Sequence, residues 1–387
     1  MPVAVAQNAS LESNGSINAE LLHFTPVAPS SEPLSYADLA TVDMATFNDG
    51  PQAQSAIAET LRKAMHEHGF FTLINHGITP QEIERQLDIA HTIFEKTPVE
   101  EKKLLEARIQ ETGSYKGFKL RQYYEMENGV TDRIEQFNWS REMTQDFPSP
   151  MKPYFDEVKA FTEKTHNLVL LNLLRLFALA LELPANTFVD KHKFDVHDES
   201  WMRCPGPDEG VDMAYYDEFT PEDEAKVKGV WLKGHQDFGS VTVLYSQPMS
   251  SLQVRDDHGN WRYVKHVPGA VIINCGTFMQ WYTGGYFKAA NHRVTAPPRD
   301  QRNHTRLGVF YFVVPNDDDK PNTLLESPVL QRAGVQAVFP PGGGVTTQAF
   351  SRARVAKVGK SEMYKKDWGN GEILTEVIAG VEVPHYG

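Results

Sequence analysis

Hydrophobic residues in the first half of the chain recur every three to four positions, a spacing typical of helices that bury one face. This pattern predicts helices over residues 53–68, 80–103 and 154–183. The last is the strongest, and Pro184 stops it. Between the first two helices, the continuous apolar run 70–74 predicts a buried strand.

After Trp201 the pattern changes to short β-rich runs separated by turn residues. The segment Asp256–Asn260 has the composition of a hairpin turn. Several short strands at this spacing indicate a barrel or a double-sheet jelly roll. We therefore expect a mainly β fold with flanking helices, a jelly-roll core supported by one long helix, and an N-terminal helical layer. The predicted strands of the core are 241–245, 252–254, 261–264, 270–274 and 307–314.

The pattern also suggests how the chain is divided. Residues 1–33 lack periodicity and are rich in Ala, Ser, Asn and Pro, so we expect a mostly disordered tail. An N-terminal region is expected over 34–150, the long helix and β core over 151–315, and a C-terminal extension packing on the core over 316–387. The acidic segment 209–228 is a candidate lid.

Composition excludes several classes of function. Hydrophobic residues make up 41% and charged residues 23%, as in ordinary globular proteins. The net charge of −13 and the lack of a basic patch argue against a nucleic-acid partner. The longest apolar run is interrupted by Asn172 and Arg175, so no membrane span is expected.

Cysteine usage bears on the compartment. Cys204 and Cys275 are far apart and form no C-x-x-C pair, so no disulfide framework is indicated. The N-terminus lacks a basic segment followed by an apolar core, and no signal peptide is evident. We expect a cytoplasmic protein acting on a small molecule, as a monomer or a homodimer.

Candidate metal ligands come from two strand-like stretches. In His235-Gln236-Asp237 the first and third residues share one face of a strand. His292 lies in a second apolar stretch, just before a Pro-Pro turn. A lone H-x-D can equally be a solvated strand end, but the apolar flanks and the second His favour a metal site. Two imidazoles and one carboxylate form the facial triad of non-haem Fe(II) oxygenases.

A candidate anchor for a 2-oxo acid follows. Arg306 is expected to open the strand after His292, and its planar guanidinium suits bidentate pairing with a distal carboxylate. Taken alone, Arg306 could also be a surface residue at a strand start. Arg299 and Arg302 are competitors, but both lie in a polar loop.

With these motifs in view, the chain resembles the Fe(II)/2-oxoglutarate-dependent dioxygenases of the plant and fungal type, which include flavonoid oxygenases and isopenicillin N synthase. The resemblance covers roughly residues 35–314 and rests on segments 68–78, 132–137 and 273–288, besides the triad. It implies a double-stranded β-helix core with Fe(II) bound by His235, Asp237 and His292, which are thus the expected catalytic residues. It also implies 2-oxoglutarate and dioxygen as cosubstrates, with ascorbate needed in vitro.

Two departures from the family pattern affect the cosubstrate site. The family has Arg-x-Ser where this chain has Arg306-Leu307-Gly308, so that hydroxyl is absent. Where the family has a tyrosine before a Pro-rich turn, Cys204 offers only a weak thiol donor. Each lost neutral hydrogen bond is worth about 1 kcal/mol. Arg306, Gly308 and Cys204 are the predicted cosubstrate-binding residues, and Arg203 or a tyrosine of 215–216 could compensate.

The resemblance further implies the reaction and a substrate class. Oxidative decarboxylation of 2-oxoglutarate to succinate would accompany hydrogen abstraction from a substrate C–H, giving hydroxylation, desaturation or ring closure. An aromatic pocket favours a flat or polycyclic secondary metabolite, such as a flavonoid, although core packing is the alternative for any single aromatic residue. The candidate pocket residues are Tyr115, Lys116, Phe118, Phe137, Met279, Trp281 and Phe312.

Two other functions stay open at this point. One is a 2-oxoglutarate-independent Fe(II) oxidase that draws all its electrons from the substrate, as isopenicillin N synthase does, and the altered carboxylate site keeps it in view. The other is a non-catalytic ligand-binding barrel. The intact His-Asp-His set argues against a pure binder, which has no need of an open iron site.

Overall fold

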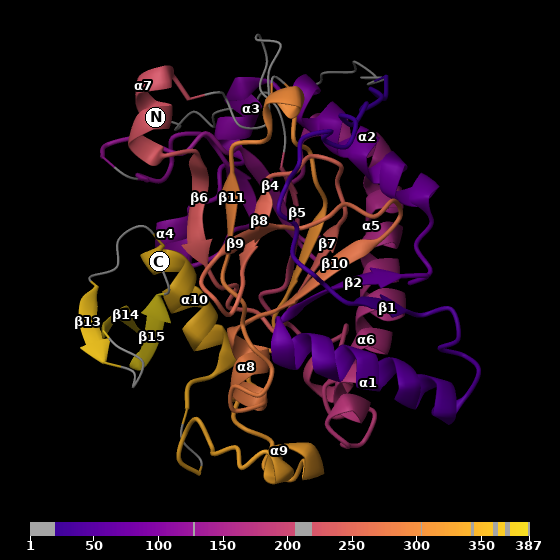
Figure 1. The fold of residues 1–387 in the computed structure, drawn as a ribbon. Coiled ribbons are helices and arrows are strands. Elements are labelled where there is room, and N and C mark those ends of the chain that lie inside the picture. The colour runs from indigo at the N-terminus through magenta and orange to yellow at the C-terminus, as the bar shows by residue number, and fades with distance from the viewer. Residues whose placement is uncertain are drawn as a thin grey trace, which may run out of the picture.

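The structure is a computed structural model, and it describes residues 20–126, 128–205, 219–302, 304–341, 344–358, 363–367 and 372–385. Its centre is a jelly roll built from two sheets (Figure 1). The large sheet has the order β1-β2-β10-β7-β12-β5-β4-β3, and the small sheet has the order β6-β11-β8-β9. The strands of the large sheet are β1 (Thr41–Asp43), β2 (Phe70–Ile74), β3 (Gly117–Lys119), β4 (Gln136–Ser140), β5 (Trp201–Pro205), β7 (Val241–Tyr245), β10 (Val271–Cys275) and β12 (Phe310–Val313). Those of the small sheet are β6 (Val230–His235), β8 (Leu252–Arg255), β9 (Trp261–Tyr263) and β11 (His292–Thr295).

Helices cover one side of the large sheet (Figure 1). The helix predicted over 80–103 is interrupted, because Pro98 ends one helical stretch and caps the next. Thr79 and Glu82 form a reciprocal capping box at the start of the first of these helices. The helices of the N-terminal half are α1 (Pro51–Glu67), α2 (Pro80–Lys96), α3 (Val99–Leu104), α4 (Ile109–Thr112), η1 (Ser149–Tyr154), α5 (Phe155–Lys164), η2 (Thr165–Leu170), α6 (Leu171–Ala180) and η3 (Val189–Lys191).

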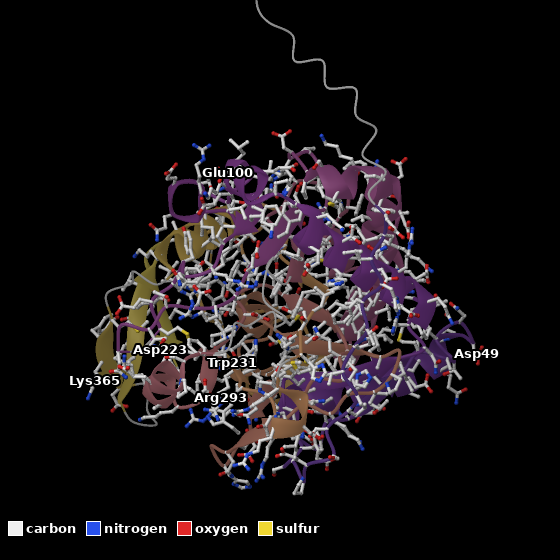
Figure 2. All side chains as sticks on the ribbon, turned by 90° about the horizontal axis from the view of Figure 1, so that it is seen from above. Asp49, Glu100, Asp223, Trp231, Arg293 and Lys365 are labelled. Carbon is white, nitrogen blue, oxygen red and sulfur yellow. The ribbon has the colours of Figure 1, made fainter. Side chains whose placement is uncertain are left out.

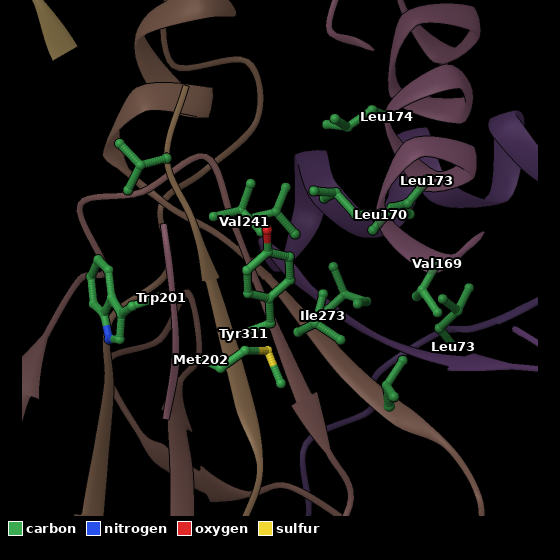
Figure 3. Close-up of a cluster of buried hydrophobic side chains, with 14 of the residues drawn as sticks. Leu73, Val169, Leu170, Leu173, Leu174, Trp201, Met202, Val241, Ile273 and Tyr311 are labelled. Carbon is green, nitrogen blue, oxygen red and sulfur yellow. The ribbon is translucent and has the colours of Figure 1, made fainter. Parts of the chain in front are cut away.

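The long predicted helix is present as α5, the π-helical turn η2 and α6 in succession. Its apolar face, which includes Val169, Leu170 and Leu173, points toward Ile273 of β10 and Tyr311 of β12 (Figure 3). All five side chains are at most 1% exposed. Burial of this face fixes the helix against the large sheet and explains its strong periodicity in the sequence.

The π-helical turn also carries polar groups into the core. Thr165 lies 2.7 Å from the hydroxyl of Tyr245, and His166 Nδ1 lies 2.8 Å from the hydroxyl of Tyr311. His166 Nε2 is 3.0 Å from the backbone oxygen of His192. These hydrogen bonds satisfy buried polar atoms and tie the long helix to β7 and β12.

Within the tail predicted over 1–33, residues 20–33 pack on the rest of the protein, while residues 1–19 lie outside the described residues. The backbone N–H of Leu22 donates to Thr92 at 2.9 Å, and that of Phe24 donates to Asp88 at 2.8 Å. Phe24 is itself buried in the main core. The segment from residue 20 therefore packs along α2, which sequence periodicity could not reveal because the segment has no regular structure.

The C-terminal part contains a third sheet that the hydrophobic pattern did not predict. Its order is β13-β14-β15, and α10 packs against β14, joined by an Arg354–Glu376 ion pair of 2.8 Å. Lys365 of this sheet and Asp49, which precedes α1, lie at opposite sides of the molecule (Figure 2). The remaining elements are α7 (Pro221–Val227), α8 (Thr277–Tyr282), η4 (Arg299–Gln301), α9 (Pro328–Arg332), α10 (Thr347–Lys357), β13 (Tyr364–Asp367), β14 (Glu372–Ile378) and β15 (Val381–His385).

Among the described residues, every helix is too short or too polar to pass through a lipid bilayer.

Candidate metal centre and adjoining cavities

The two candidate histidines come from neighbouring strands of the small sheet. β6 and β11 pair antiparallel, and His235 stands directly opposite His292 in the register. Their ring centroids are 4.3 Å apart. Asp237 follows the end of β6, and its Oδ1 atom lies 3.8 Å from Nε2 of each histidine. The three ligand atoms lie within 4.8 Å of one another.

Backbone carbonyls fix the orientation of both rings. Nδ1 of His235 lies 2.9 Å from the oxygen of Lys233, and Nδ1 of His292 lies 3.2 Å from the oxygen of Ala290. A ring that donates its Nδ1 proton to a carbonyl keeps Nε2 as a free lone pair. Both lone pairs therefore face the carboxylate of Asp237.

The carboxylate of Asp237 is held by the large sheet. Its Oδ2 atom accepts hydrogen bonds from Thr242 Oγ1 of β7 at 2.7 Å and from Asn274 Nδ2 of β10 at 2.8 Å. These two donors leave Oδ1 directed at the imidazoles. Outer hydrogen bonds of this kind orient metal ligands in proteins.

The protonation states suit a divalent cation. Burial, followed by the proximity of His292, lowers the pKa of His235 to about 4. Burial raises the pKa of Asp237, but the two histidines and the bonds from Thr242 and Asn274 outweigh it, so this pKa lies below its usual value. At neutral pH the site presents a neutral His235 imidazole and an anionic oxygen. Two imidazoles and one carboxylate on one side of an open space fit non-haem Fe(II).

An inner cavity of about 90 Å³ lies between the two sheets at this cluster. Arg306, which is only 6% exposed, lines it together with the three candidate ligands. Arg306 was predicted to open a strand, but β12 begins only at Phe310, so the arginine lies in the segment before it. The cavity is also lined by Phe70, Ile134, Gln136, Arg203, Leu232, Thr242, Leu244, Leu252, Asn274, Val294, Phe310 and Phe312.

An outer cavity of about 280 Å³ adjoins the cluster through His235 and Asp237. Its walls are rich in aromatic rings, and the guanidinium of Arg203 lies over three of them. The distances from its carbon to the ring centroids are 4.6 Å for Phe312, 5.1 Å for Tyr115 and 5.8 Å for Trp201. Contacts of this kind hold an arginine in place in a low-dielectric site. The other aromatic residues of the wall are Tyr124, Trp231 and Phe238.

The predicted pocket residues separate into two groups. Tyr115 and Phe312 line the outer cavity, whereas Lys116 lines a small neighbouring cavity with Trp201. The other four are packed in the main core and do not line the inner or the outer cavity: Phe118, Phe137, Met279 and Trp281.

Strand alternation explains part of this difference. On β3 and β4, Lys119 and Gln136 line the outer cavity, so Phe118 and Phe137 face the opposite side, where their rings pack in a tilted arrangement with centroids 4.6 Å apart. On α8, Trp281 packs against Phe278 at 5.4 Å. Most of the aromatic residues that were predicted to line the pocket therefore belong to the hydrophobic core.

The prediction for Cys204 is corrected by the same alternation. On β5, Trp201 and Arg203 line the outer cavity, whereas Met202 and Cys204 are buried in the main core. Burial raises the pKa of the Cys204 thiol well above its usual value, which keeps it protonated. The polar side chain that β5 directs at the cavities is therefore that of Arg203, and the Cys204 thiol points away from them.

Several residues at the cavities were missed by sequence reasoning. Thr242 and Asn274 each interrupt an otherwise apolar buried strand, and a polar residue in such a place is the signal that could have found them. The candidate lid over 209–228 lies outside the described residues up to 218. Its described end forms α7, where Glu224 accepts a bond of 3.2 Å from Trp231 Nε1.

Comparison with known sequences identifies two matching families. Residues 39–158 match the family described as non-haem dioxygenase in morphine synthesis N-terminal. Residues 207–315 match the 2OG-Fe(II) oxygenase superfamily. Together these matches span more than half of the chain. The second contains the candidate ligands His235, Asp237 and His292.

Individual relatives agree with these families. Scopoletin 8-hydroxylase of Arabidopsis thaliana is 26% identical over 307 residues, covering 79% of this chain and 78% of the relative. Flavonol synthase/flavanone 3-hydroxylase of Eustoma exaltatum subsp. russellianum is 27% identical, covering 68% of this chain and 74% of the relative. The fold matches that of a full-length Neurospora crassa protein solved in complex with alpha-KG, with a TM-score of 0.68, 19% identity, and coverage of 84% of this chain and 100% of that one. The chain belongs to the 2OG-Fe(II) oxygenase superfamily and is a 2-oxoglutarate-dependent dioxygenase that uses Fe(II), 2-oxoglutarate and dioxygen.

Proposed function

We propose that the protein oxidises a C–H bond of a small aromatic or polycyclic secondary metabolite, by hydroxylation, desaturation or ring closure. In this proposal His235, Asp237 and His292 bind Fe(II), and Arg306 binds the distal carboxylate of 2-oxoglutarate. The observation that supports it most directly is the convergence of two Nε2 atoms and one carboxylate oxygen where the inner and outer cavities adjoin.

In this proposal the metal ligands, their hydrogen-bond donors and Arg306 have separate roles. Bound Fe(II) supplies the dioxygen and one-electron chemistry. The three ligands keep the metal on one side of the inner cavity, and Thr242 and Asn274 keep the Asp237 carboxylate turned toward it. The buried guanidinium of Arg306 gives 2-oxoglutarate a fixed cationic partner in the inner cavity, whose lining also includes Arg203.

The outer cavity would hold the substrate. Its volume of about 280 Å³ lies just below the range of roughly 300–1,000 Å³ for small-molecule sites. Rings from Tyr115, Trp201 and Phe312 offer flat apolar surfaces and exclude water. Two relatives are named scopoletin 8-hydroxylase and flavonol synthase/flavanone 3-hydroxylase, which supports a ring-containing substrate.

The proposal also covers the cellular compartment and the oligomeric state of the enzyme. We place it in the cytoplasm, as a monomer or a homodimer. Cys204 and Cys275 are both buried free thiols, which suits a reducing compartment.

An anaerobic titration tests the binding of 2-oxoglutarate to the Fe(II)-loaded protein and the role of Arg306. The Fe(II)-loaded protein is titrated with 2-oxoglutarate while the visible charge-transfer band of the chelate is followed. We expect a saturable band, with the affinity lowered about 10- to 100-fold in Arg306→Ala because a charge-assisted bond is lost. Arg299→Ala, an exposed arginine of the neighbouring loop, is the matched control and should leave the affinity unchanged.

The substrate class is tested separately, under air. Flavanones, coumarins and aliphatic acids of similar size are screened for stimulation of succinate formation. Stimulation by planar ring compounds supports the proposal, and stimulation by aliphatic acids alone contradicts it. Iron binding without any band at saturating 2-oxoglutarate would contradict the assigned cosubstrate site and favour an oxidase that needs no 2-oxo acid.

A further inference from the structure

The segment that leads into β12 alternates between the core and the inner cavity. Leu307 and Val309 are buried in the main core, whereas Arg306 and Phe310 line the inner cavity. Gly308 therefore belongs to the cavity side of the segment. A Cβ atom built on Gly308 would lie 2.9 Å from Cε2 of Phe310, which is consistent with this direction.

The space beside Gly308 is already filled by an amide. The same Cβ atom would collide with Nε2 of Gln247, two residues beyond the end of β7. Any side chain at position 308, including the serine typical of the family, would displace this amide. The absence of a side chain at Gly308 thus leaves the space that the amide of Gln247 fills.

Gln247 carries a buried donor that lacks a partner. Its Nε2 atom is inaccessible to solvent and has no hydrogen-bond partner among the described residues. An unsatisfied buried donor costs about 1–3 kcal/mol. Gln247 and Arg306 also line a common third cavity of about 230 Å³, so the amide lies in the surroundings of the proposed carboxylate anchor.

We propose that Gln247 donates its amide N–H to the distal carboxylate of 2-oxoglutarate, beside Arg306. The amide of Gln247, which follows β7, then takes the place of the missing serine hydroxyl, and Gly308 leaves room for it. This inference rests on the proposed role of Arg306. It explains how the carboxylate is held although Gly308 brings no hydroxyl and Cys204 faces the core.

The first test compares two 2-oxo acids. Binding of 2-oxoglutarate and of 2-oxopentanoate, which lacks the distal carboxylate, is measured by the anaerobic titration described above. We expect Gln247→Leu to weaken 2-oxoglutarate about 10-fold and to leave 2-oxopentanoate unchanged, because only the former can accept the bond. Gln247→Glu should weaken 2-oxoglutarate further by repulsion, and Gln52→Leu on the surface of α1 is the control.

The second test exchanges the two donors. Gly308→Ser alone should weaken 2-oxoglutarate, because its Cβ collides with the amide of Gln247. Combined with Gln247→Ala, the serine gains room, and the affinity should return to within about threefold of wild type. Melting temperature and Fe(II) affinity, measured for every variant, identify any that merely unfolds.

Two results would overturn the inference. One is unchanged 2-oxoglutarate affinity in Gln247→Leu, and the other is an equal loss for both 2-oxo acids, which would assign Gln247 a packing role. If Gln247→Leu behaves like wild type while Arg306→Ala loses affinity, the inference fails and the proposed function stands. If the wild-type protein itself shows no chelate band, both the proposed function and this inference fail.

Discussion

The two sheets of the core differ in how they contribute to the metal centre. The small sheet supplies both histidines, from the paired ends of β6 and β11. The large sheet supplies Thr242 and Asn274, which orient the carboxylate. The centre is therefore assembled across the gap between the sheets, with the imidazoles on one side and the groups that hold Asp237 on the other.

The sheets also differ in burial. Every residue of β7 and β10 is buried, because the long helix packs on one face of these strands and the other face is enclosed around the inner cavity. In β6, by contrast, only Trp231 is buried, and Leu232 is 36% exposed. The comparison indicates that the large sheet provides a rigid platform, while the strand that carries His235 stays accessible to metal, cosubstrate and substrate.

The largest expected effect comes from removing a ligand of the small sheet. His235→Ala and His292→Ala should each lower Fe(II) affinity by more than the roughly 10- to 100-fold that outer partners carry. Anaerobic calorimetry with Fe(II) measures the loss. His258→Ala, in the exposed turn between β8 and β9, is the control. Wild-type affinity in either ligand variant would show that the metal lies elsewhere.

A cavity between the large sheet and the helix that covers it should affect stability instead. Leu173→Ala removes a fully buried side chain of α6, and we expect a loss of about 2–5 kcal/mol in the free energy of unfolding. Denaturant titration measures this loss, while Fe(II) affinity should stay within about twofold of wild type. Leu325→Ala, at a side chain that is 46% exposed, should cost less than about 0.5 kcal/mol. A large loss of Fe(II) affinity in the folded Leu173 variant would contradict the proposal that this core contact serves stability and not metal binding.

The contribution of the large sheet to the metal centre should be intermediate. Thr242→Val removes the hydroxyl that holds Asp237 and keeps the side-chain shape. We expect Fe(II) affinity to fall about 10-fold, which is the smaller of the losses typical when a residue that hydrogen-bonds to a metal ligand is removed. Thr72→Val, at a buried threonine of β2 in the same sheet, is the matched control. Equal affinities for the two variants would mean that β7 does not orient the ligand.

The smallest effect near neutral pH concerns His166, which is buried in the π-helical turn against the large sheet. Burial lowers its pKa to about 3, so the folded protein keeps it neutral while the unfolded chain binds a proton near pH 6.5. Stability from this group is present above pH 6.5 and is lost as the pH falls toward 3. We expect the free energy of unfolding to decrease less between pH 7 and pH 5 in His166→Gln than in wild type. Identical pH dependence in both would show that other groups cause the acid sensitivity.

Patterns local to the sequence predicted much of the architecture. The apolar spacing from 154 to 183 and the short β runs after Trp201 correspond to the long helix and to the strands of the jelly roll. The resemblance drawn from these motifs agrees with the family to which the chain belongs. Residues 20–33 and the third sheet escaped prediction, because contacts with distant elements rather than periodicity order them.

The sequence by itself determined the residue types of the candidate centre, since the H-x-D spacing and the distant histidine are local features of two strands. Tertiary structure decided which side of each strand faces the cavities. It turned Arg203 toward them and Cys204 away, and it brought the Gln247 amide to Gly308 from a different strand end. Strand parity follows from pairing register, and packing across sheets joins residues far apart in the chain, so neither can be obtained from local spacing alone.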